Sequence, residues 1–110
     1  MEVWRFGLKP AEGTGVVEDA TGEGEKLAYI ADIEVPAGAR VLDRVELSSN
    51  GITIYAIVDP DAEKVTRSFF VCGNGIALPD QACTAEQYVG TFKVPMGPTA
   101  HVFELALVEA

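Results

Sequence analysis

The chain has 110 residues, of which 48% are hydrophobic and 23% are charged, a composition typical of one globular domain with its own core. Its 17 acidic and 8 basic residues give a net charge of -9, which argues against general nucleic-acid binding, because that function needs a basic face. Every apolar run is shorter than the ~18 residues of a membrane span, and the first ten residues lack the pattern of a secretory signal.

The first strand and the segment that follows it differ in composition. Residues 2–8 place Trp4, Phe6 and Leu8 on one face, and this alternation predicts a β-strand. Residues 10–26 then contain four glycines and five acidic residues, which cannot bury much apolar surface. We interpret residues 10–26 as an acidic, glycine-rich insertion in which the apolar pair Val16–Val17 is able to form a short arm.

Six further runs of apolar and β-branched residues follow, separated by turn signals. Strands are predicted over residues 27–35, 39–49, 52–58, 65–73, 88–94 and 99–109. Turns are predicted at Pro36–Gly38, at the hairpin signal Asn50–Gly51 and over residues 59–64, with one helical turn at residues 84–87. About seven strands with such turns predict a single all-β domain over residues 1–110, either an antiparallel β-sandwich or a small barrel.

The segment 59–63 invites a metal-site interpretation, because Asp59, Asp61 and Glu63 occupy alternate positions. A calcium loop that began at Asp59 would need glycine at its sixth position and glutamate at its twelfth, where this chain has Lys64 and Phe70. A turn needs only Pro60 at its first central position and a hydrogen bond from the backbone to Asp59. We therefore predict a turn and no metal site.

Catalytic chemistry has little support in the sequence. His101 is the only histidine, which excludes a multi-histidine metal site, and no serine or cysteine nucleophile motif accompanies it. Cys72 lies in an apolar strand and Cys83 in a polar loop, and we expect reduced thiols although a bridge between them remains open. Glu104 falls on an otherwise apolar face, where Arg67 or Arg44 would be its partner.

The aromatic residues lie within alternating or continuous apolar runs, so we interpret them as core rather than as a base-stacking surface. This set contains Trp4, Phe6, Tyr55, Phe69, Phe70, Phe92 and Phe103.

The sequence 73–75, Gly-Asn-Gly, follows an apolar strand but lacks the helix and the motif of a phosphate loop. Its glycines favour a sharp turn, and its backbone N–H groups are the part available to a ligand.

Several segments, read in order, resemble one protein family. They are "VWRFGL", "IEVPAGARVLDRVE", "IYAIVDPDAEKVTRSFFVCGNG", "QYVGTFKV" and "HVFE". Together they resemble the DUF7352 family of small uncharacterised proteins of bacteriophages and prophages, over residues 3–8 and about 30–104. The acidic segment 10–26 departs from the family pattern, as does Ile76, where the family tends to have histidine. The resemblance implies a phage or prophage origin and no particular activity.

Functions from three classes fit these observations, and we favour the first. It is a non-enzymatic binding protein in the cytoplasm of the infected bacterial host, which sequesters a small nucleotide immune signal without a cofactor. The candidate ligand-binding residues are Gly73, Asn74, Gly75, Arg67, Arg44, Tyr55 and His101. The alternatives are a virion accessory or capsid decoration protein, and a small hydrolase that uses Asp59, Asp61 or Glu104 with His101. Open sheet edges favour a homo-oligomer, and the other expected partner is a phage or host protein.

Overall fold

The computed structural model describes residues 1–10, 16–18, 25–48, 51–74, 76, 88–93 and 99–105, and the side chains of these residues except 16–18, 25–27, 47, 48, 51 and 93. These residues form strands and turns only. The strands are β1 (Glu2–Leu8), β2 (Val16–Glu18), β3 (Glu25–Pro36), β4 (Arg40–Ser48), β5 (Gly51–Val58), β6 (Lys64–Gly73), β7 (Tyr88–Lys93) and β8 (Thr99–Glu104). The predicted helical turn at 84–87 lies outside the described residues.

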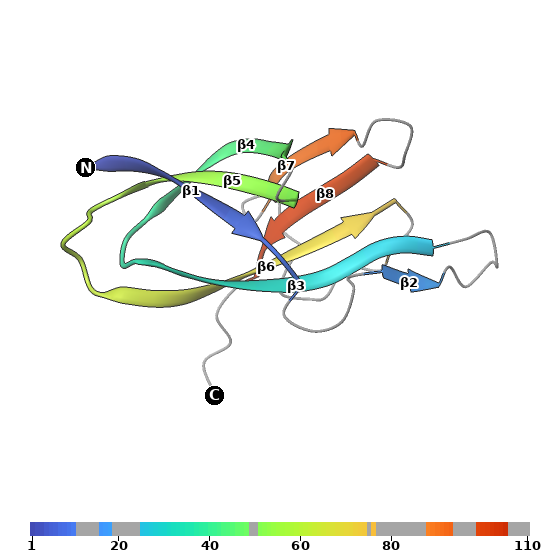
Figure 1. Ribbon diagram of the computed structural model, residues 1–110, viewed down its shortest axis with the longest axis horizontal. Coiled ribbons are helices and arrows are strands. Elements are labelled where there is room, and N and C mark those ends of the chain that lie inside the picture. The colour runs from blue at the N-terminus through green and yellow to red at the C-terminus, as the bar shows by residue number, and fades with distance from the viewer. Residues whose placement is uncertain are drawn as a thin grey trace.

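The strands form two antiparallel sheets that pack face to face as a sandwich (Figure 1). The smaller sheet has the order β1-β5-β4, and the larger has the order β2-β3-β6-β8-β7. The expectation of an all-β sandwich is confirmed. The predicted arm at Val16–Val17 is the three-residue strand β2, which pairs with the start of β3.

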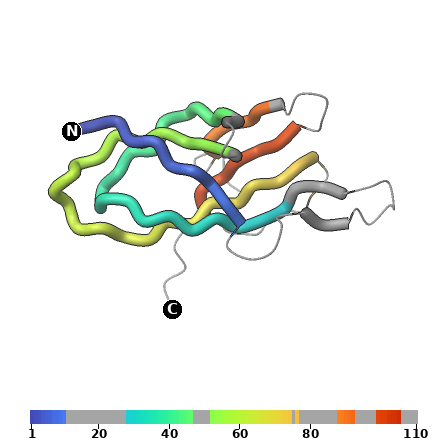
Figure 2. Tube along the Cα trace, in the orientation of Figure 1, coloured from blue at the N-terminus to red at the C-terminus, as the bar shows by residue number. Residues whose placement is uncertain are grey.

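Two turns at one end of the molecule carry the chain between the sheets (Figure 2). Between β3 and β4, the Ala39 N–H donates to the Pro36 carbonyl over 3.2 Å, and Gly38 has the positive φ of 79° that this turn needs. Between β5 and β6, the Asp59 side chain accepts from the Asp61 N–H over 3.0 Å, as predicted for a turn. The Ala37 N–H donates to the Glu63 carbonyl over 2.7 Å and so ties the two turns together.

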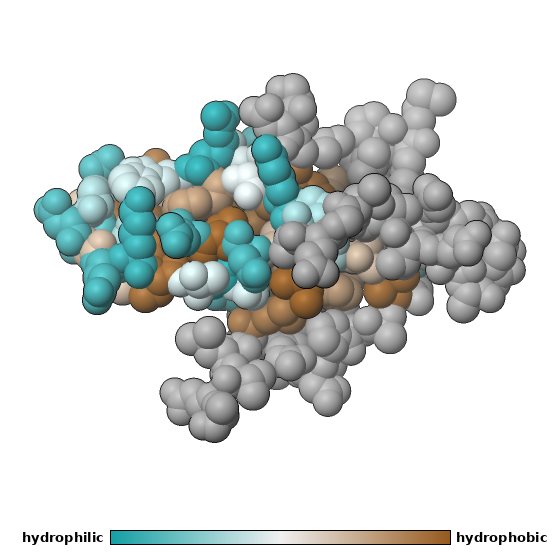
Figure 3. Space-filling view, turned by 60° about the horizontal axis from the view of Figure 1, so that its bottom comes forward, coloured by the Kyte–Doolittle hydropathy of each residue, from teal (hydrophilic) through white to brown (hydrophobic). Residues whose placement is uncertain are grey.

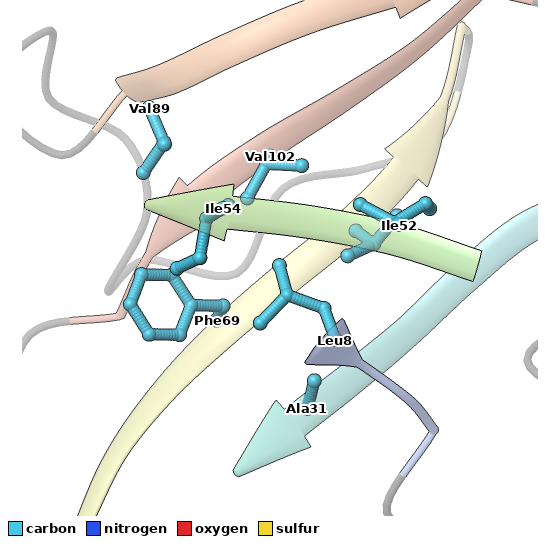
Figure 4. Close-up of a cluster of buried hydrophobic side chains, with 8 residues drawn as sticks. Leu8, Ala31, Ile52, Ile54, Phe69, Val89 and Val102 are labelled. Carbon is cyan, nitrogen blue, oxygen red and sulfur yellow. The ribbon is translucent and has the colours of Figure 1, made fainter. Parts of the chain in front are cut away.

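The core lies between the inner faces of the two sheets. Trp4, Phe6 and Leu8 point inward from β1, as the alternation predicted, and Leu8 is buried. With Leu8, the main cluster draws on six strands (Figure 4), and its other members are Ala31, Ile52, Ile54, Phe69, Val71, Val89 and Val102. The predicted β4–β5 hairpin is present, because Ser48 pairs with Gly51; its connecting residues 49 and 50 lie outside the described part.

Tyr29 joins the two sheets with a side-chain hydrogen bond. Its hydroxyl, which is half-buried, donates to the Leu8 carbonyl at the end of β1 over 2.9 Å. Burial raises the pKa of Tyr29 from 10.0 to about 12, because the phenolate would lose its hydration there. The folded state therefore holds the phenol proton at pH values where the unfolded chain has released it.

We expect the free energy of unfolding to fall as the pH rises from 10 to about 12, because the raised pKa of Tyr29 contributes stability only while the phenol stays protonated. The full shift corresponds to about 2.7 kcal/mol, and solvent screening of this half-exposed ring reduces it to roughly 1 kcal/mol. Urea unfolding at each pH measures the fall, and Tyr29→Phe should make it shallower. If the free energy of unfolding fell equally with pH in the wild type and in Tyr29→Phe, the fall would not be caused by Tyr29.

The sheets meet most closely where β4 faces β7. A Cβ atom placed on Gly90 of β7 would lie 2.7 Å from a methyl carbon of Val45 in β4. Real Cβ atoms do not approach so closely, so glycine at this position is what allows the two edge strands to touch. Both strands are irregular here, with register shifts between Val41 and Val45 and between Tyr88 and Gly90.

Gly90→Ala should lower the free energy of unfolding by about 1–3 kcal/mol, because the new methyl group overpacks the β4–β7 contact. The double variant with Val45→Ala removes the clashing methyl and should recover part of this loss. Urea denaturation of the wild type, both single variants and the double variant measures the coupling. Strictly additive losses would show that the clash is not the cause.

Candidate functional site

The outer face of the five-stranded sheet carries a row of apolar side chains that runs across four strands. Ile30 of β3 pairs with Phe70 of β6, Phe70 pairs with Phe103 of β8, and Phe103 pairs with Tyr88 of β7. Ile30 and Tyr88, at the two ends of the row, are each 45% exposed, and the two phenylalanines between them are partly exposed. We call these four residues the apolar row.

The apolar row does not belong to the core. Both core clusters of the described residues consist of inward-facing side chains and include none of the four. The Tyr88 and Phe103 rings contact each other with centroids 5.6 Å apart and planes tilted by 51°. The prediction that all the aromatic residues are core is therefore wrong for Phe70 and Phe103, and also for Tyr55 of β5, because alternation turns each of them away from the facing sheet.

Polar groups border the apolar row on one side and form a chain of hydrogen bonds. Tyr88 and Thr91 share a hydrogen bond between their hydroxyls, and the Thr91 hydroxyl is 2.9 Å from His101 Nδ1. His101 Nε2 is 2.6 Å from the Asn74 side-chain oxygen. A neutral ring that donates from Nε2 to Asn74 and accepts at Nδ1 from Thr91 satisfies every bond. His101 is thus oriented by partners on both sides.

The opposite border of the apolar row is also polar. The Ser68 hydroxyl donates to the Asp32 carboxylate over 2.5 Å, and these two residues are paired across β6 and β3. Figure 3 shows hydrophilic side chains gathered at the end of the molecule with the two turns and hydrophobic surface nearer its middle. An apolar strip with hydrogen-bonding groups along both sides is suited to binding a ligand that is flat and partly polar.

Cys72 is the cross-strand neighbour of His101, yet the pair does not make an activated nucleophile. The Cys72 side chain is buried, and burial raises the pKa of its thiol. Both ring nitrogens of His101 already have partners in Thr91 and Asn74. The thiol therefore stays protonated, and we interpret Cys72 as a packing residue, as its sequence context predicted.

Arg67 and Glu104 form a half-buried ion pair at the open edge between the sheets. Two guanidinium nitrogens of Arg67 lie 2.5 and 2.6 Å from the two carboxylate oxygens of Glu104, and a third donates to the Ala39 carbonyl over 2.5 Å. The side chains are 20% and 27% exposed. The predicted pairing of Glu104 with Arg67 is confirmed, and Ala39 extends it from the large sheet to the turn before β4. We call this group the arginine clamp.

The arginine clamp lines a hollow of about 280 Å³ between β4 and β7. Its wall contains Ala39, Arg40, Val41, Leu42, Asp43, Arg67, Tyr88, Val89 and Glu104. The three guanidinium nitrogens of Arg67 donate to Glu104 and Ala39. A ligand could therefore bind Arg67 only by displacing a contact that joins the two sheets.

A third cluster lies on the outer face of the three-stranded sheet. Arg44, which is 74% exposed, donates to one carboxylate oxygen of Glu46 over 2.8 Å, and the Tyr55 hydroxyl donates to the other over 2.9 Å. The hydrogen bond from Arg44, followed by that from Tyr55, lowers the pKa of Glu46. The hydrogen bond to Glu46 is also the largest cause of the raised pKa of Tyr55.

The structure separates the predicted ligand-binding residues into three places. Asn74 and His101 lie on the outer face of the large sheet, and Gly73 is buried beside them at the end of β6. Arg67 lies at the open edge between the sheets, and Arg44 with Tyr55 lies on the opposite outer face. One small ligand cannot contact all of them. Gly75 lies outside the described residues.

The sequence interpretation missed Ile30, Tyr88 and Thr91. A signal was available in the consecutive apolar residues of "FFVC" in β6, because such a run is apolar on both faces of its sheet. Within the described residues, no three histidine, cysteine or acidic side chains come together as a metal site. The same residues form no helix long and apolar enough to cross a membrane.

The fold and this surface define an antiparallel β-sandwich with an open, partly aromatic sheet face. The family model of DUF7352, a domain of unknown function, matches residues 26–110, and the chain therefore belongs to this family. The match begins at the last residue of the acidic segment 10–26. No curated protein and no solved structure matches the chain.

Breaking the arginine clamp should destabilise the sandwich. Glu104→Ala leaves the half-buried guanidinium without its acid, and we expect a loss of about 2–3 kcal/mol in the free energy of unfolding. The double variant Arg67→Met with Glu104→Leu should lose less free energy of unfolding than the sum of the losses of Arg67→Met alone and Glu104→Leu alone. Urea denaturation provides the comparison, with Glu46→Ala in the exposed Arg44 pair as the matched control, which should have a far smaller effect. A control loss as large as that of Glu104→Ala would contradict the role of the clamp.

Proposed function

We propose that this protein is a non-enzymatic binding protein, encoded by a phage or prophage, that sequesters a small nucleotide signal of the host. In this proposal the ligand binds to the outer face of the five-stranded sheet, and its base stacks on the apolar row. Sequestration requires tight binding without turnover, and the cytoplasm of the infected cell is where such a ligand is found.

The observation that supports this site is the apolar row with an oriented hydrogen-bonding chain directly beside it. A base has a flat apolar face and a polar edge, so it can stack on Tyr88 and Phe103 while its edge reaches the side-chain amide of Asn74, which His101 orients. Stacking of a base on an aromatic side chain contributes about 1–3 kcal/mol. A sheet face of this kind makes a shallow site, which favours recognition of the base rather than enclosure of the whole ligand.

The charges around the face decide which part of a nucleotide is recognised. Arg67 and Arg44 both have carboxylate partners, and of the two only Arg67 comes near the apolar row, in the hollow that it lines together with Tyr88. Asp32 is a charged side chain at the row's own border, and its charge would repel a phosphate. The phosphates would therefore contribute little to binding, and the affinity should depend only weakly on salt.

Most of the groups named for a hydrolase take part in other interactions. Glu104 is held by Arg67, the Cys72 thiol is kept protonated by burial, and Asp59 accepts a hydrogen bond within its turn. His101 has partners at both ring nitrogens. These contacts support binding without turnover.

A virion accessory protein is the second candidate, and the composition of the apolar row favours it. Ile30 of β3 and Phe70 of β6 form the half of the row that carries no polar atom, and exposed apolar surface of this kind is typical of contacts with another protein. In that case the same face would dock on a capsid or another phage protein.

The test is thermal unfolding of the purified protein with a panel of cyclic mononucleotides, cyclic di- and oligonucleotides and ADP-ribose derivatives. Saturation at 100 times the dissociation constant stabilises a one-site protein by about 2.7 kcal/mol, which raises the midpoint by roughly ten degrees. We expect one ligand class to produce this rise, equally at low and high salt. Tyr88→Ala should weaken binding by roughly tenfold or more.

Tyr55→Ala is the matched control, because it removes a tyrosine from the opposite outer face and should leave the affinity unchanged. Recovery of intact ligand supports sequestration, and recovery of a cleaved product would point to a hydrolase instead. A flat response across the panel would overturn the nucleotide proposal. A response that Tyr55→Ala abolishes and Tyr88→Ala does not would place the ligand on the other sheet.

A further inference from the structure

The sandwich has four edge strands, and three of them are poor templates for pairing with another strand. β4 is interrupted by a register shift between Val41 and Val45, β7 is interrupted between Tyr88 and Gly90, and β2 has only three residues. Bulges and short length are the usual means by which sheet edges avoid unwanted pairing. β1 has neither, because it pairs with β5 in unbroken register from Glu2 to Leu8.

Apolar side chains are also strongly exposed at the start of β1, at Val3 and at Met1 just before the strand. Met1 and Val3 are 86% and 60% exposed, the two highest values among the large hydrophobic side chains of the described residues. Val3 lies on the outer face of the sheet with Arg5, whereas Trp4 and Phe6 point to the inner side. A regular edge with uncovered apolar side chains is suited to the addition of a strand.

The local charge permits a second copy of this acidic chain to approach at β1. Residues 1–10 contain Arg5 and Lys9 against the single acid Glu2, although the whole chain carries a net charge of -9. Two copies that met through another acidic surface would repel each other, whereas two β1 strands meet where the charge is locally positive and small. This difference favours self-association through β1 over the other edges.

We propose that two copies of this protein pair through antiparallel β1 strands about a two-fold axis and form one continuous six-stranded sheet from their two small sheets. This inference does not rest on the proposed nucleotide function, because β1 and the apolar row lie on different sheets. In a two-fold pairing, directly opposite residues point to the same face of the sheet. The numbers of two opposite residues in β1 are therefore both even or both odd, which limits the possible registers.

One register fits the side chains best. Pairing Arg5 with Arg5 of the second copy places like charges directly opposite each other, and pairing Val3 with Val3 engages only residues 1–5. The register between these two aligns Val3 with Arg5 of the second copy and Trp4 with Trp4 of the second copy, over residues 1–7. Val3 then covers the aliphatic stem of the arginine on the outer face.

Two substitutions of Val3 test this register, and both leave the fold intact because the side chain points into solvent. Val3→Lys places a positive charge opposite Arg5 of the second copy, and Val3→Glu places a negative charge there. We expect the dissociation constants of the two variants to differ by about tenfold or more, with the glutamate variant tighter, because the contact occurs twice in the dimer. Net charge alone predicts the opposite order, since Val3→Glu makes the chain more acidic.

Sedimentation velocity over a concentration series measures the dissociation constant, with circular dichroism as the check on folding. Trp4 is the only tryptophan, so its fluorescence provides a second readout that should shift to shorter wavelength as the dimer forms. A protein that stays monomeric at all concentrations would overturn the proposal. A dimer whose dissociation constant is unchanged by both Val3 substitutions would also overturn it, and so would a dimer that dissociates on Tyr88→Ala. In either case the interface would lie away from β1.

Discussion

The five-stranded sheet is apolar on both faces, and the three-stranded sheet can cover only one of them. In β6, Phe69 and Val71 point inward and are fully buried, while Phe70 points outward between Ile30 and Phe103. Burial of the inner face provides the main stabilisation of the sandwich, because apolar area removed from water contributes about 25 cal/mol per Å². The outer face is then left with apolar groups that no described strand covers.

Two contacts fix which face is covered. Gly90 lets β7 touch β4, and the arginine clamp joins β6 and β8 to the turn before β4. Both act at the same open edge, and together they hold the small sheet over the inner face. The clamp also removes Arg67 and Glu104 from the groups available for chemistry. The same interaction that stabilises the fold therefore engages the charged groups of this edge, and we place the proposed ligand on the outer face instead.

Much of the fold could be predicted from the sequence, because its signals are local. Alternation placed Trp4, Phe6 and Leu8 in the core, and the turn at Asp59 followed from the preferences of aspartate and proline. The partner of Glu104 is also among the predicted alternatives, since an acid on an otherwise apolar face needs a base. The family was recognised from short segments spread along the chain and is shown by the match over residues 26–110.

The site could be predicted only in part, because it depends on strand order. His101 and Asn74 were chosen from the sequence, but Thr91 and Tyr88 join them only when β7 lies beside β8. The apolar row brings together residues 30, 70, 88 and 103, and no pattern within a single strand indicates that they are neighbours. The sequence left Arg67 and Arg44 open as partners of Glu104, and strand order decides between them: Arg67 of β6 lies beside Glu104 of β8, whereas Arg44 pairs with Glu46 of its own strand.

The central claim is that the apolar row is open in the free protein, and NMR with a neutral paramagnetic co-solute tests it most directly. The co-solute broadens the methyl signals of side chains that it can approach. We predict strong broadening of the Ile30 methyl signals, comparable to that of exposed Val3, while buried Ile54 stays sharp. An Ile30 signal as protected as that of Ile54 would show that the outer face is covered and would contradict the account.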